Sequence, residues 1–236
     1  MSGSNDTSKR IIKIVVLATI LILPGFLYYL LEREGKNRYK SLPVYGAKEL
    51  TGTFSKRMGK EIPDTLFHQL TSFKAVNQES DTLLVLSESA NITVVNFFYT
   101  RCETFCDLLL KEMDRVATRF ANNQRVDFYS MTVDTVYDRP AILKQYSDGL
   151  APQAKKWNFL TSPFNTLEVI RRGFLVDALE DPSRPGIFIH SSSFVLLDSK
   201  RRIRGYYDVN HPKEIDRLID EIKLLLVEEI RLNDAY

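Results

Sequence analysis

Cysteine is scarce in this chain: its 236 residues include only two, Cys102 and Cys106. So few thiols exclude a small secreted scaffold held together by several disulfides. The chain also lacks an internal repeat, a low-complexity tract and a strong excess of one charge, because 32 Lys and Arg stand against 30 Asp and Glu. These absences exclude collagen-like and disordered chains, and no nucleic-acid partner is expected, since such binders gather basic residues on one face or arm. The remaining composition, 44% hydrophobic, is that of a globular protein with one sizeable core.

One long apolar run stands out near the start of the chain. Residues 11–31, IIKIVVLATILILPGFLYYLL, contain a single charge, Lys13. As a helix this run would be about 31 Å long, the thickness of the hydrocarbon core of a bilayer. The residues after it lack the small-residue pattern of a signal-peptidase site, and no cysteine follows the run to carry a lipid. We therefore predict an N-terminal tail at 1–10 and an uncleaved transmembrane anchor in the lipid bilayer at 11–31.

The charges beside this run do not decide its orientation. They are nearly balanced between the two sides: Lys9, Arg10 and Lys13 on one, Arg33, Lys36, Arg38 and Lys40 on the other. A short leading tail before an uncleaved apolar run is typical of a signal anchor, which translocates the large C-terminal part. We expect a single-pass protein of a bacterial inner membrane, with the C-terminal domain on the periplasmic side. Residues 41–236 carry 25 basic and 27 acidic residues, so this part is near neutral.

The rest of the chain alternates between strand and helix patterns. Residues 41–62 mix Gly, Pro and charge without periodicity, which predicts a linker at 32–61 before a folded domain at 62–236. The domain's apolar runs and helical spacings predict five strands, at 82–87, 92–100, 126–134, 187–198 and 202–209, and helices that follow Cys106, Pro140, Asn165 and His211. A strand–helix–strand unit followed by a hairpin and a closing helix predicts an α/β fold, a thioredoxin-like three-layer sandwich with a central mixed sheet and helices on both faces.

The two cysteines lie where the best strand of the chain meets its helix. At such a junction, backbone N–H groups and the helix dipole favour a thiolate over a thiol. If the helix includes both residues, their spacing of four puts both sulfurs on one face, close enough to share a soft metal ion or, with modest adjustment, to form a disulfide. Two small buried residues are the plain structural alternative. The polar residues around them, Glu103, Thr104 and Asp107, favour a reactive pair.

Three histidines are candidates to complete such a site. His211 precedes Pro212 at a helix start, and His68 lies in a predicted early strand, so ordinary structural roles are expected for both. His190 follows a loop rich in Pro and Gly and begins a strand whose end adjoins the cysteine junction in a thioredoxin-like sheet. A structural role for His190 is an equal alternative. Two thiolates and an imidazole suit Cu(I), whereas zinc usually takes a fourth ligand.

With these segments in order, the chain resembles the SCO/SenC family of membrane-anchored copper proteins. The resemblance spans roughly residues 62–227 and rests on four segments: FFYTRCETFC, TVDTVYDRPAILKQY, WNFLTS and IHSSSFVLLDSKRRIRGYYD. It implies a thioredoxin-like fold that binds copper, as Cu(I) or Cu(II), through Cys102, Cys106 and His190. It also implies a role in delivering copper to the binuclear copper site of cytochrome c oxidase, or in reducing the thiols of that site. Asp134 matches the family's acidic residue near the metal.

The chain departs from the family pattern at four positions. Glu103 and Asp107 stand where family members commonly have prolines, Ile189 replaces the usual Asp before the histidine, and Thr135 replaces a proline. An acidic residue beside the thiols tends to raise their pKa, which opposes the effect of the helix end.

Three functions remain open from the sequence. The first is a copper metallochaperone that passes Cu(I) to a partner, either the copper-site subunit of cytochrome c oxidase or another copper protein. The second is an anchored thiol-disulfide oxidoreductase, in which Cys102 attacks a client disulfide and Cys106 resolves the intermediate. The third is a non-catalytic, anchored interaction module with a static disulfide.

Overall fold

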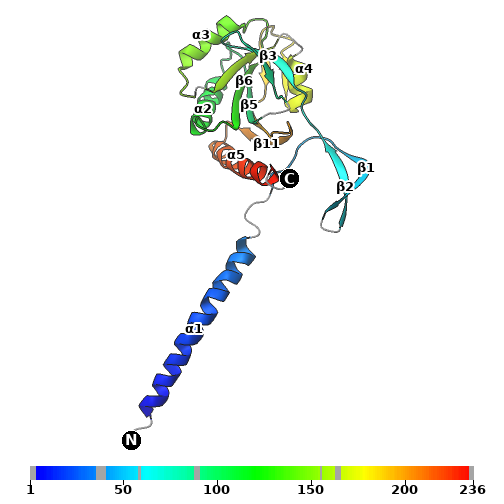
Figure 1. Ribbon diagram of the computed structural model, residues 1–236. Helices are drawn as coiled ribbons and strands as arrows, with labels where there is room; N and C mark the ends of the chain where they lie inside the picture. Colours follow the sequence, from blue (N-terminus) through cyan, green and yellow to red (C-terminus); the bar gives the residue numbers. More distant parts are fainter. Residues whose placement is uncertain are drawn as a thin grey trace. The chain divides into compact units, whose positions relative to one another are not determined.

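The computed structural model describes residues 4–35, 41–57, 60–87, 91–154, 156–162 and 166–233. It divides into two compact units, Met1–Ser41 and Leu42–Tyr236 (Figure 1). Parts of the predicted tail, linker and domain end, namely residues 1–3, 36–40, 58–59 and 234–236, lie outside the described residues, as do the flanking charges Lys36, Arg38 and Lys40.

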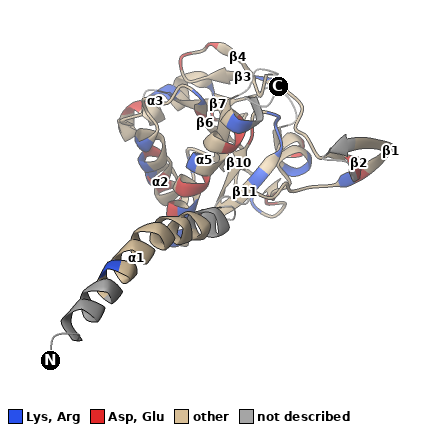
Figure 2. Ribbon diagram, turned by 60° about the horizontal axis from the view of Figure 1, so that its bottom comes forward, with Lys and Arg blue, Asp and Glu red and all other residues tan. Residues whose placement is uncertain are grey.

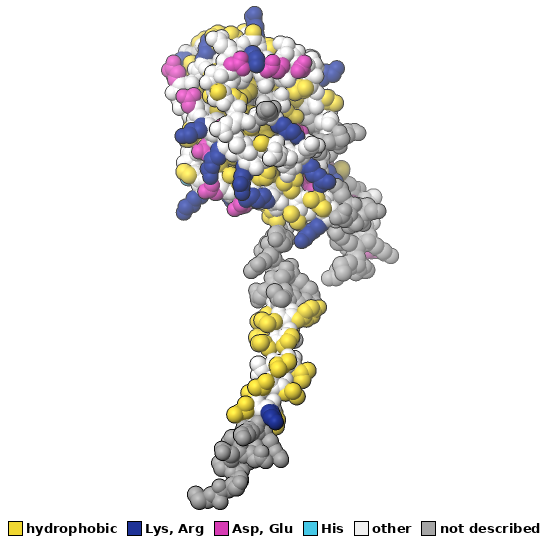
Figure 3. Space-filling model, turned by 60° about the vertical axis from the view of Figure 1, so that its left-hand side comes forward, with side chains coloured by type: hydrophobic (Ala, Val, Ile, Leu, Met, Phe, Trp, Pro, Cys, Tyr) yellow, Lys and Arg dark blue, Asp and Glu magenta, His cyan; other side chains and the backbone are white. Residues whose placement is uncertain are grey.

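The first unit contains one helix, α1 (Ser4–Gly35). Its stretch Ile12–Leu30 is long and apolar enough to cross a membrane by length and composition. The side chains of this stretch are exposed, and Figure 3 shows hydrophobic groups around the described part of the helix. This helix therefore coincides with the predicted span and remains a candidate anchor.

The second unit is built on a seven-stranded mixed sheet with the order β11-β10-β5-β6-β7-β3-β4. The strands are β3 (Phe73–Asn77), β4 (Thr82–Val85), β5 (Ile92–Phe98), β6 (Val126–Thr132), β7 (Trp157–Thr161), β10 (Ser193–Leu197) and β11 (Ile203–Asp208). Strands β5, β6 and β7 run parallel, and the strands beyond them pair antiparallel. Every residue of β5 is buried, as its nearly continuous apolar sequence predicts for a central strand.

Helices cover both faces of this sheet. Alternate residues of β5 point to opposite faces, so this strand contributes side chains to both cores. Val94 and Phe98 pack into the core that also holds α2 (Cys106–Arg119), α3 (Pro140–Leu150) and α5 (Pro212–Asn233). Val95 and Phe97 pack into the second core, with α4 (Thr166–Glu168) and the π-helical turn η1 (Val169–Phe174). Basic and acidic residues are interspersed along α2 and α5 (Figure 2). The predicted three-layer sandwich is confirmed.

Two short ribbons differ from the sequence prediction. An antiparallel hairpin of β1 (Lys48–Arg57) and β2 (Lys60–Phe67) extends from the predicted linker at 32–61 into the predicted domain at 62–236, and His68 follows this hairpin rather than lying in a strand. The predicted strand 187–198 is interrupted at Ser191 and Ser192. Its first part, β9 (Phe188–His190), leaves the main sheet and pairs with β8 (Ala178–Glu180). The interruption places His190 on a separate ribbon beside the sheet.

The compact unit begins at Leu42, earlier than the predicted boundary at 62. The cause is Arg204, whose side chain is 2% exposed and donates hydrogen bonds to the carbonyls of Leu42 (2.7 Å) and Pro43 (3.1 Å). Its charge is paired with Asp198 and Glu228. A buried guanidinium needs this full set of partners, so the lead-in segment is part of the packed domain.

Candidate metal centre

Cys102 and Cys106 lie at the carboxyl end of the central strand. β5 ends at Phe98, a loop follows, and α2 begins at Cys106, so only the second cysteine is helical. Their sulfurs form a disulfide, with the Cα atoms 6.0 Å apart. Cys106 is fully buried, whereas Cys102 is partly exposed. The junction therefore presents one accessible sulfur and one shielded sulfur.

His190 reaches this pair from β9. Its Nε2 atom lies 3.4 Å from Sγ of Cys106, and its Nδ1 atom lies 3.2 Å from the carbonyl oxygen of Ser191. A carbonyl accepts hydrogen bonds only, so Nδ1 carries the proton and the lone pair of Nε2 faces the sulfur. Burial of the ring lowers the pKa of His190 to about 4. The imidazole is therefore neutral near pH 7, the form in which it binds metals.

The three predicted ligands meet in one place. Sγ of Cys102, Sγ of Cys106 and a ring nitrogen of His190 all lie within 4.8 Å of one another. Across the parts of the chain that the structure describes, no other set of three His, Cys, Asp or Glu side chains gathers in this way. The rings of Phe105 and Tyr99 pack against His190, with centroids 4.8 and 5.7 Å away. These aromatic neighbours pack against the imidazole and contribute to its burial.

The other two histidines lie elsewhere. Nε2 of His68 is 2.7 Å from the carbonyl oxygen of Gly173, so His68 ties the end of the first hairpin to η1. His211 is exposed, and its Nδ1 lies 3.4 Å from a carboxylate oxygen of Asp208. Both placements match the structural roles that their sequence positions suggested.

Asp134 lies beside the site without joining the three ligands. Its side chain is 4% exposed, and its Oδ2 atom accepts a hydrogen bond from Nη2 of Arg101 at 2.5 Å. Its other oxygen accepts the backbone N–H of Tyr137 at 3.1 Å. Asp134 thus bonds the residue directly before Cys102 rather than His190.

A buried carboxylate that the sequence analysis missed fixes the start of the cysteine loop. Asp138 accepts the backbone N–H of Thr100 at 3.0 Å and the hydroxyls of Thr100 and Thr132. Burial raises the pKa of Asp138, and these hydrogen bonds oppose the rise. The sequence signal was present, since Asp138 lies in the segment TVDTVYDRP, but its three partners come from two strand ends that meet only in the fold.

The four departures from the family pattern lie on the surface or away from the sulfurs. Glu103 and Asp107 are exposed, and Ile189 is 49% exposed because alternate residues of β9 point outward. Thr135 is partly buried in the turn after Asp134.

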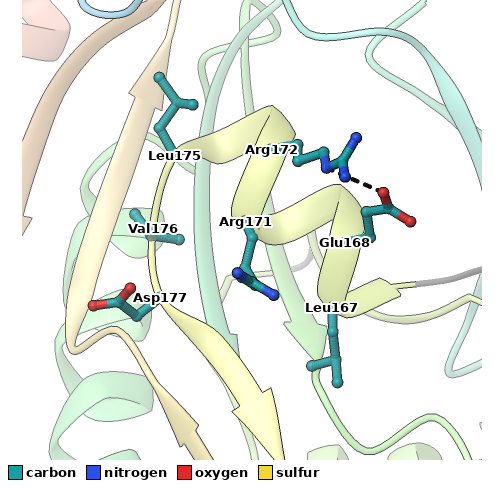
Figure 4. Close-up of a pocket in the computed structure, with 7 residues that line it drawn as sticks. All are labelled: Leu167, Glu168, Arg171, Arg172, Leu175, Val176 and Asp177. Atoms are coloured by element: carbon teal, nitrogen blue, oxygen red, sulfur yellow. Dashed lines mark ion pairs between the residues drawn. The ribbon is translucent and has the colours of Figure 1, made fainter.

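One hollow on the domain is a separate feature. It has a volume of about 640 Å³ and lies between η1 and the start of β8 (Figure 4), lined by Leu167, Glu168, Arg171, Arg172, Leu175, Val176 and Asp177. Its one drawn ion pair joins Arg172 to Glu168 at 3.1 Å and is largely exposed. None of the three predicted ligands lines this hollow, so the chemistry of the sulfur and imidazole cluster, rather than pocket size, identifies the candidate site.

Comparisons with known proteins agree with this geometry. The family model described as SCO1/SenC matches residues 65–226. A curated relative, the SCO1 protein homolog of Bacillus subtilis (strain 168), is 26% identical over 168 residues, which cover 70% of this chain and 86% of the relative.

Solved structures show the same fold at low identity. A SCO1/SenC family lipoprotein from Bacillus anthracis str. Ames is 24% identical with a TM-score of 0.59, over 67% of this chain and 95% of that one. ScoI of Bradyrhizobium japonicum, solved with copper bound, is 21% identical with a TM-score of 0.52, over 65% and 99%. Since the family model matches well over half of its residues, this chain belongs to the SCO1/SenC family.

Proposed function

We propose that this protein is a copper metallochaperone that holds Cu(I) through Cys102, Cys106 and His190 and supports assembly of the binuclear copper site of cytochrome c oxidase. The observation that carries the proposal is the convergence of the three ligand atoms within 4.8 Å. Relatives support the choice of metal and process: a solved neighbour, BsSco, is described as a member of the Sco family of cytochrome c oxidase assembly proteins, and yeast Sco1 was solved with copper bound.

The donor set fits Cu(I) better than other metals. Thiolates are soft ligands that select Cu(I), and two of them with one imidazole complete a three-coordinate site. Zinc would require a fourth donor. Copper binds after the disulfide takes up two electrons, because thiolates and not disulfide sulfurs are the ligands. The partly exposed sulfur of Cys102 is then the place where an incoming thiolate of the partner begins the ligand exchange.

The partner that fits this transfer is the copper-site subunit of cytochrome c oxidase or another copper protein with thiolate ligands. The apolar stretch of α1 would anchor the chain at 11–31 as a single-pass protein of a bacterial inner membrane. In this arrangement the domain lies on the periplasmic side, where a copper site outside the cytoplasm is within reach. The residues between the span and Leu42 then serve as the tether.

A second candidate function is thiol-disulfide exchange, favoured by the disulfide between one accessible and one buried cysteine. In the reduced protein, the Cys102 thiolate attacks a client disulfide and releases one client thiolate. Cys106 then attacks the mixed disulfide, which frees the second client thiolate and leaves the Cys102–Cys106 disulfide. Two electrons from an external thiol donor restore the starting state. His190 has no required part in this cycle.

Copper titration of the full-length, reduced protein tests the first proposal. We expect one Cu(I) per chain, and we expect His190→Ala to weaken binding by at least about tenfold, since a site that loses one of three ligands is incomplete. The matched control is His211→Ala, which removes an exposed histidine and leaves affinity unchanged. Equal affinities for the two variants would contradict the ligand set. Reduction of a client disulfide that survives His190→Ala but is lost with Cys102→Ser would favour the second candidate.

A further inference from the structure

Arg101, the residue directly before Cys102, is placed between the loops that surround the sulfurs. Its Nη2 atom donates to Oδ2 of Asp134 at 2.5 Å, and this carboxylate is almost fully buried while the guanidinium is 45% exposed. The ion pair joins the cysteine loop to the loop that follows β6.

The same guanidinium touches two further groups. Its central carbon lies 4.2 Å from the ring centroid of Tyr137, a cation–π distance. A Cβ atom added at Gly186 would lie 3.2 Å from Nη2 of Arg101, so the backbone of the β8–β9 loop passes close to the charge. This loop leads into Phe188–His190, the strand that carries the histidine. Arg101, which itself lies in the cysteine loop, therefore contacts both the loop after β6 and the loop that leads to His190.

The position of Arg101 also affects the balance of charge at the copper site. Two thiolates, one Cu(I) and a neutral imidazole carry a net charge of −1, and Asp134 adds another negative charge nearby. Arg101, the residue next to Cys102, supplies a positive charge that is paired with the carboxylate of Asp134 and lies against the loop that leads to His190. Loss of Arg101 would leave the anionic copper site beside an unpaired buried carboxylate, whereas loss of the Asp134 charge would leave it beside an unpaired cation.

We propose that Arg101 is a positioning residue whose charge, balanced against Asp134, sets the affinity of the site for Cu(I). This inference rests on the proposed copper function. Arg101 does not touch the metal. It holds the cysteine loop against its neighbours and offsets the negative charge that the thiolates bring to the loaded site.

Two roles for the ion pair predict different results. If it only ties two loops together, Arg101→Gln and Asp134→Asn break the same bond and both weaken copper binding. If charge sets the affinity, the two substitutions act in opposite directions. The double variant, which removes both charges, then returns toward the affinity of the unchanged protein.

The experiment is competition for Cu(I) between the full-length reduced protein and a chromophoric Cu(I) chelator. We expect Arg101→Gln to weaken binding about three- to tenfold, a modest factor because the guanidinium is partly solvated. Asp134→Asn should tighten binding by a similar factor, and Arg101→Lys, which keeps the charge, should stay closer to the unchanged protein. The matched control is the exposed pair of Arg115 and Asp216, which has the same 2.5 Å contact on α2 and α5. Arg115→Gln and Asp216→Asn should leave the affinity unchanged.

Three results would overturn the inference. Weaker Cu(I) binding in both Arg101→Gln and Asp134→Asn would mean that the ion pair only holds the two loops together. Unchanged Cu(I) binding in both would mean that the ion pair has no role in copper affinity. If Asp134→Asn fails to fold, equal losses for Arg101→Gln and Arg101→Lys would exclude the charge effect. Failure of the unchanged protein to bind Cu(I) would instead overturn the proposed function itself, so the two failures are distinguishable.

Discussion

Nε2 of His190 lies 3.4 Å from Sγ of Cys106, although the two residues are 84 positions apart in the chain. The contact joins the N-terminus of α2 to the β8–β9 ribbon, which is a separate two-stranded sheet and not part of the seven-stranded sheet. It depends on the interruption at Ser191 and Ser192, which turns β9 away from β10 and toward the cysteines.

The two cysteines should differ in reactivity once the disulfide is reduced. Cys102 is partly exposed and Cys106 is fully buried, so a small alkylating reagent should reach Cys102 first. In single variants, the thiol that remains in Cys106→Ser should react at least about tenfold faster than the thiol that remains in Cys102→Ser. Mass spectrometry after timed quenching measures both rates. Equal rates would mean that Cys106 is not shielded.

Asp138 should stabilise the start of the cysteine loop. Asp138→Ala leaves the N–H and hydroxyl of Thr100 and the hydroxyl of Thr132 without their acceptor, which should cost about 3 kcal/mol of unfolding free energy. Asp138→Asn keeps an acceptor oxygen and should cost less. Urea unfolding of residues 42–236, followed by the fluorescence of buried Trp157, gives these values. Asp148→Ala, at an exposed helical position, is the control, and an equal loss in both alanine variants would refute the prediction.

Burial of His190 should make the metal-free domain less stable in acid. Its pKa falls from the usual histidine value of about 6.5 to about 4 in the folded state, because burial disfavours the charged ring. Above about pH 6.5 both states hold a neutral ring, and below it the unfolded state gains a proton that the folded state refuses. Stability should therefore be lost as the pH falls from about 6.5 to 4, by up to about 3 kcal/mol.

His190→Asn should remove this part of the acid slope, whereas His211→Asn should keep it. Unfolding free energies at pH 7, 6 and 5 provide the comparison. If the unfolding free energy falls with pH equally in the unchanged domain and in His190→Asn, the ring of His190 is not buried in its neutral form.

Labelling of a single thiol tests the proposed orientation of the chain in the membrane. Cys106→Ser leaves Cys102 as the one cysteine of the chain, partly exposed in the domain beyond α1. In intact bacterial cells with a permeabilised outer membrane, a maleimide that cannot cross the inner membrane should label Cys102 after reduction. Labelling only after the inner membrane is lysed would place the domain in the cytoplasm.

Long periodic segments made the fold predictable. The nearly continuous apolar run at 92–98 identified the central strand, and Leu109, Met113 and Val116 identified the helix that follows it. Shorter elements gave less signal: β3 and β7 have five residues each and include the polar side chains Lys74 and Asn158, so no apolar periodicity marks them. The first hairpin was missed because β1 contains only two large apolar residues, Leu50 and Phe54, so no run of alternating apolar residues marks it.

The three candidate ligands could be selected from the sequence, but their environment could not. Residue type and position singled out Cys102, Cys106 and His190, since thiols at a strand–helix junction are rare and only three histidines compete. The Arg101–Asp134 pair and the Asp138 hydrogen bonds join residues 33 and 38 positions apart, and a single sequence does not reveal which side chains meet across such separations. The outward direction of Ile189 likewise follows from the β8–β9 pairing, which no local pattern predicts.

X-ray absorption at the copper edge is the most direct test of the proposed site. The Cu(I)-loaded, full-length protein should show two sulfur scatterers and one nitrogen scatterer per copper, and His190→Ala should lose the nitrogen while His211→Ala retains it. A spectrum with sulfur neighbours alone in the unchanged protein, or one that His190→Ala leaves the same, would contradict a centre formed by Cys102, Cys106 and His190.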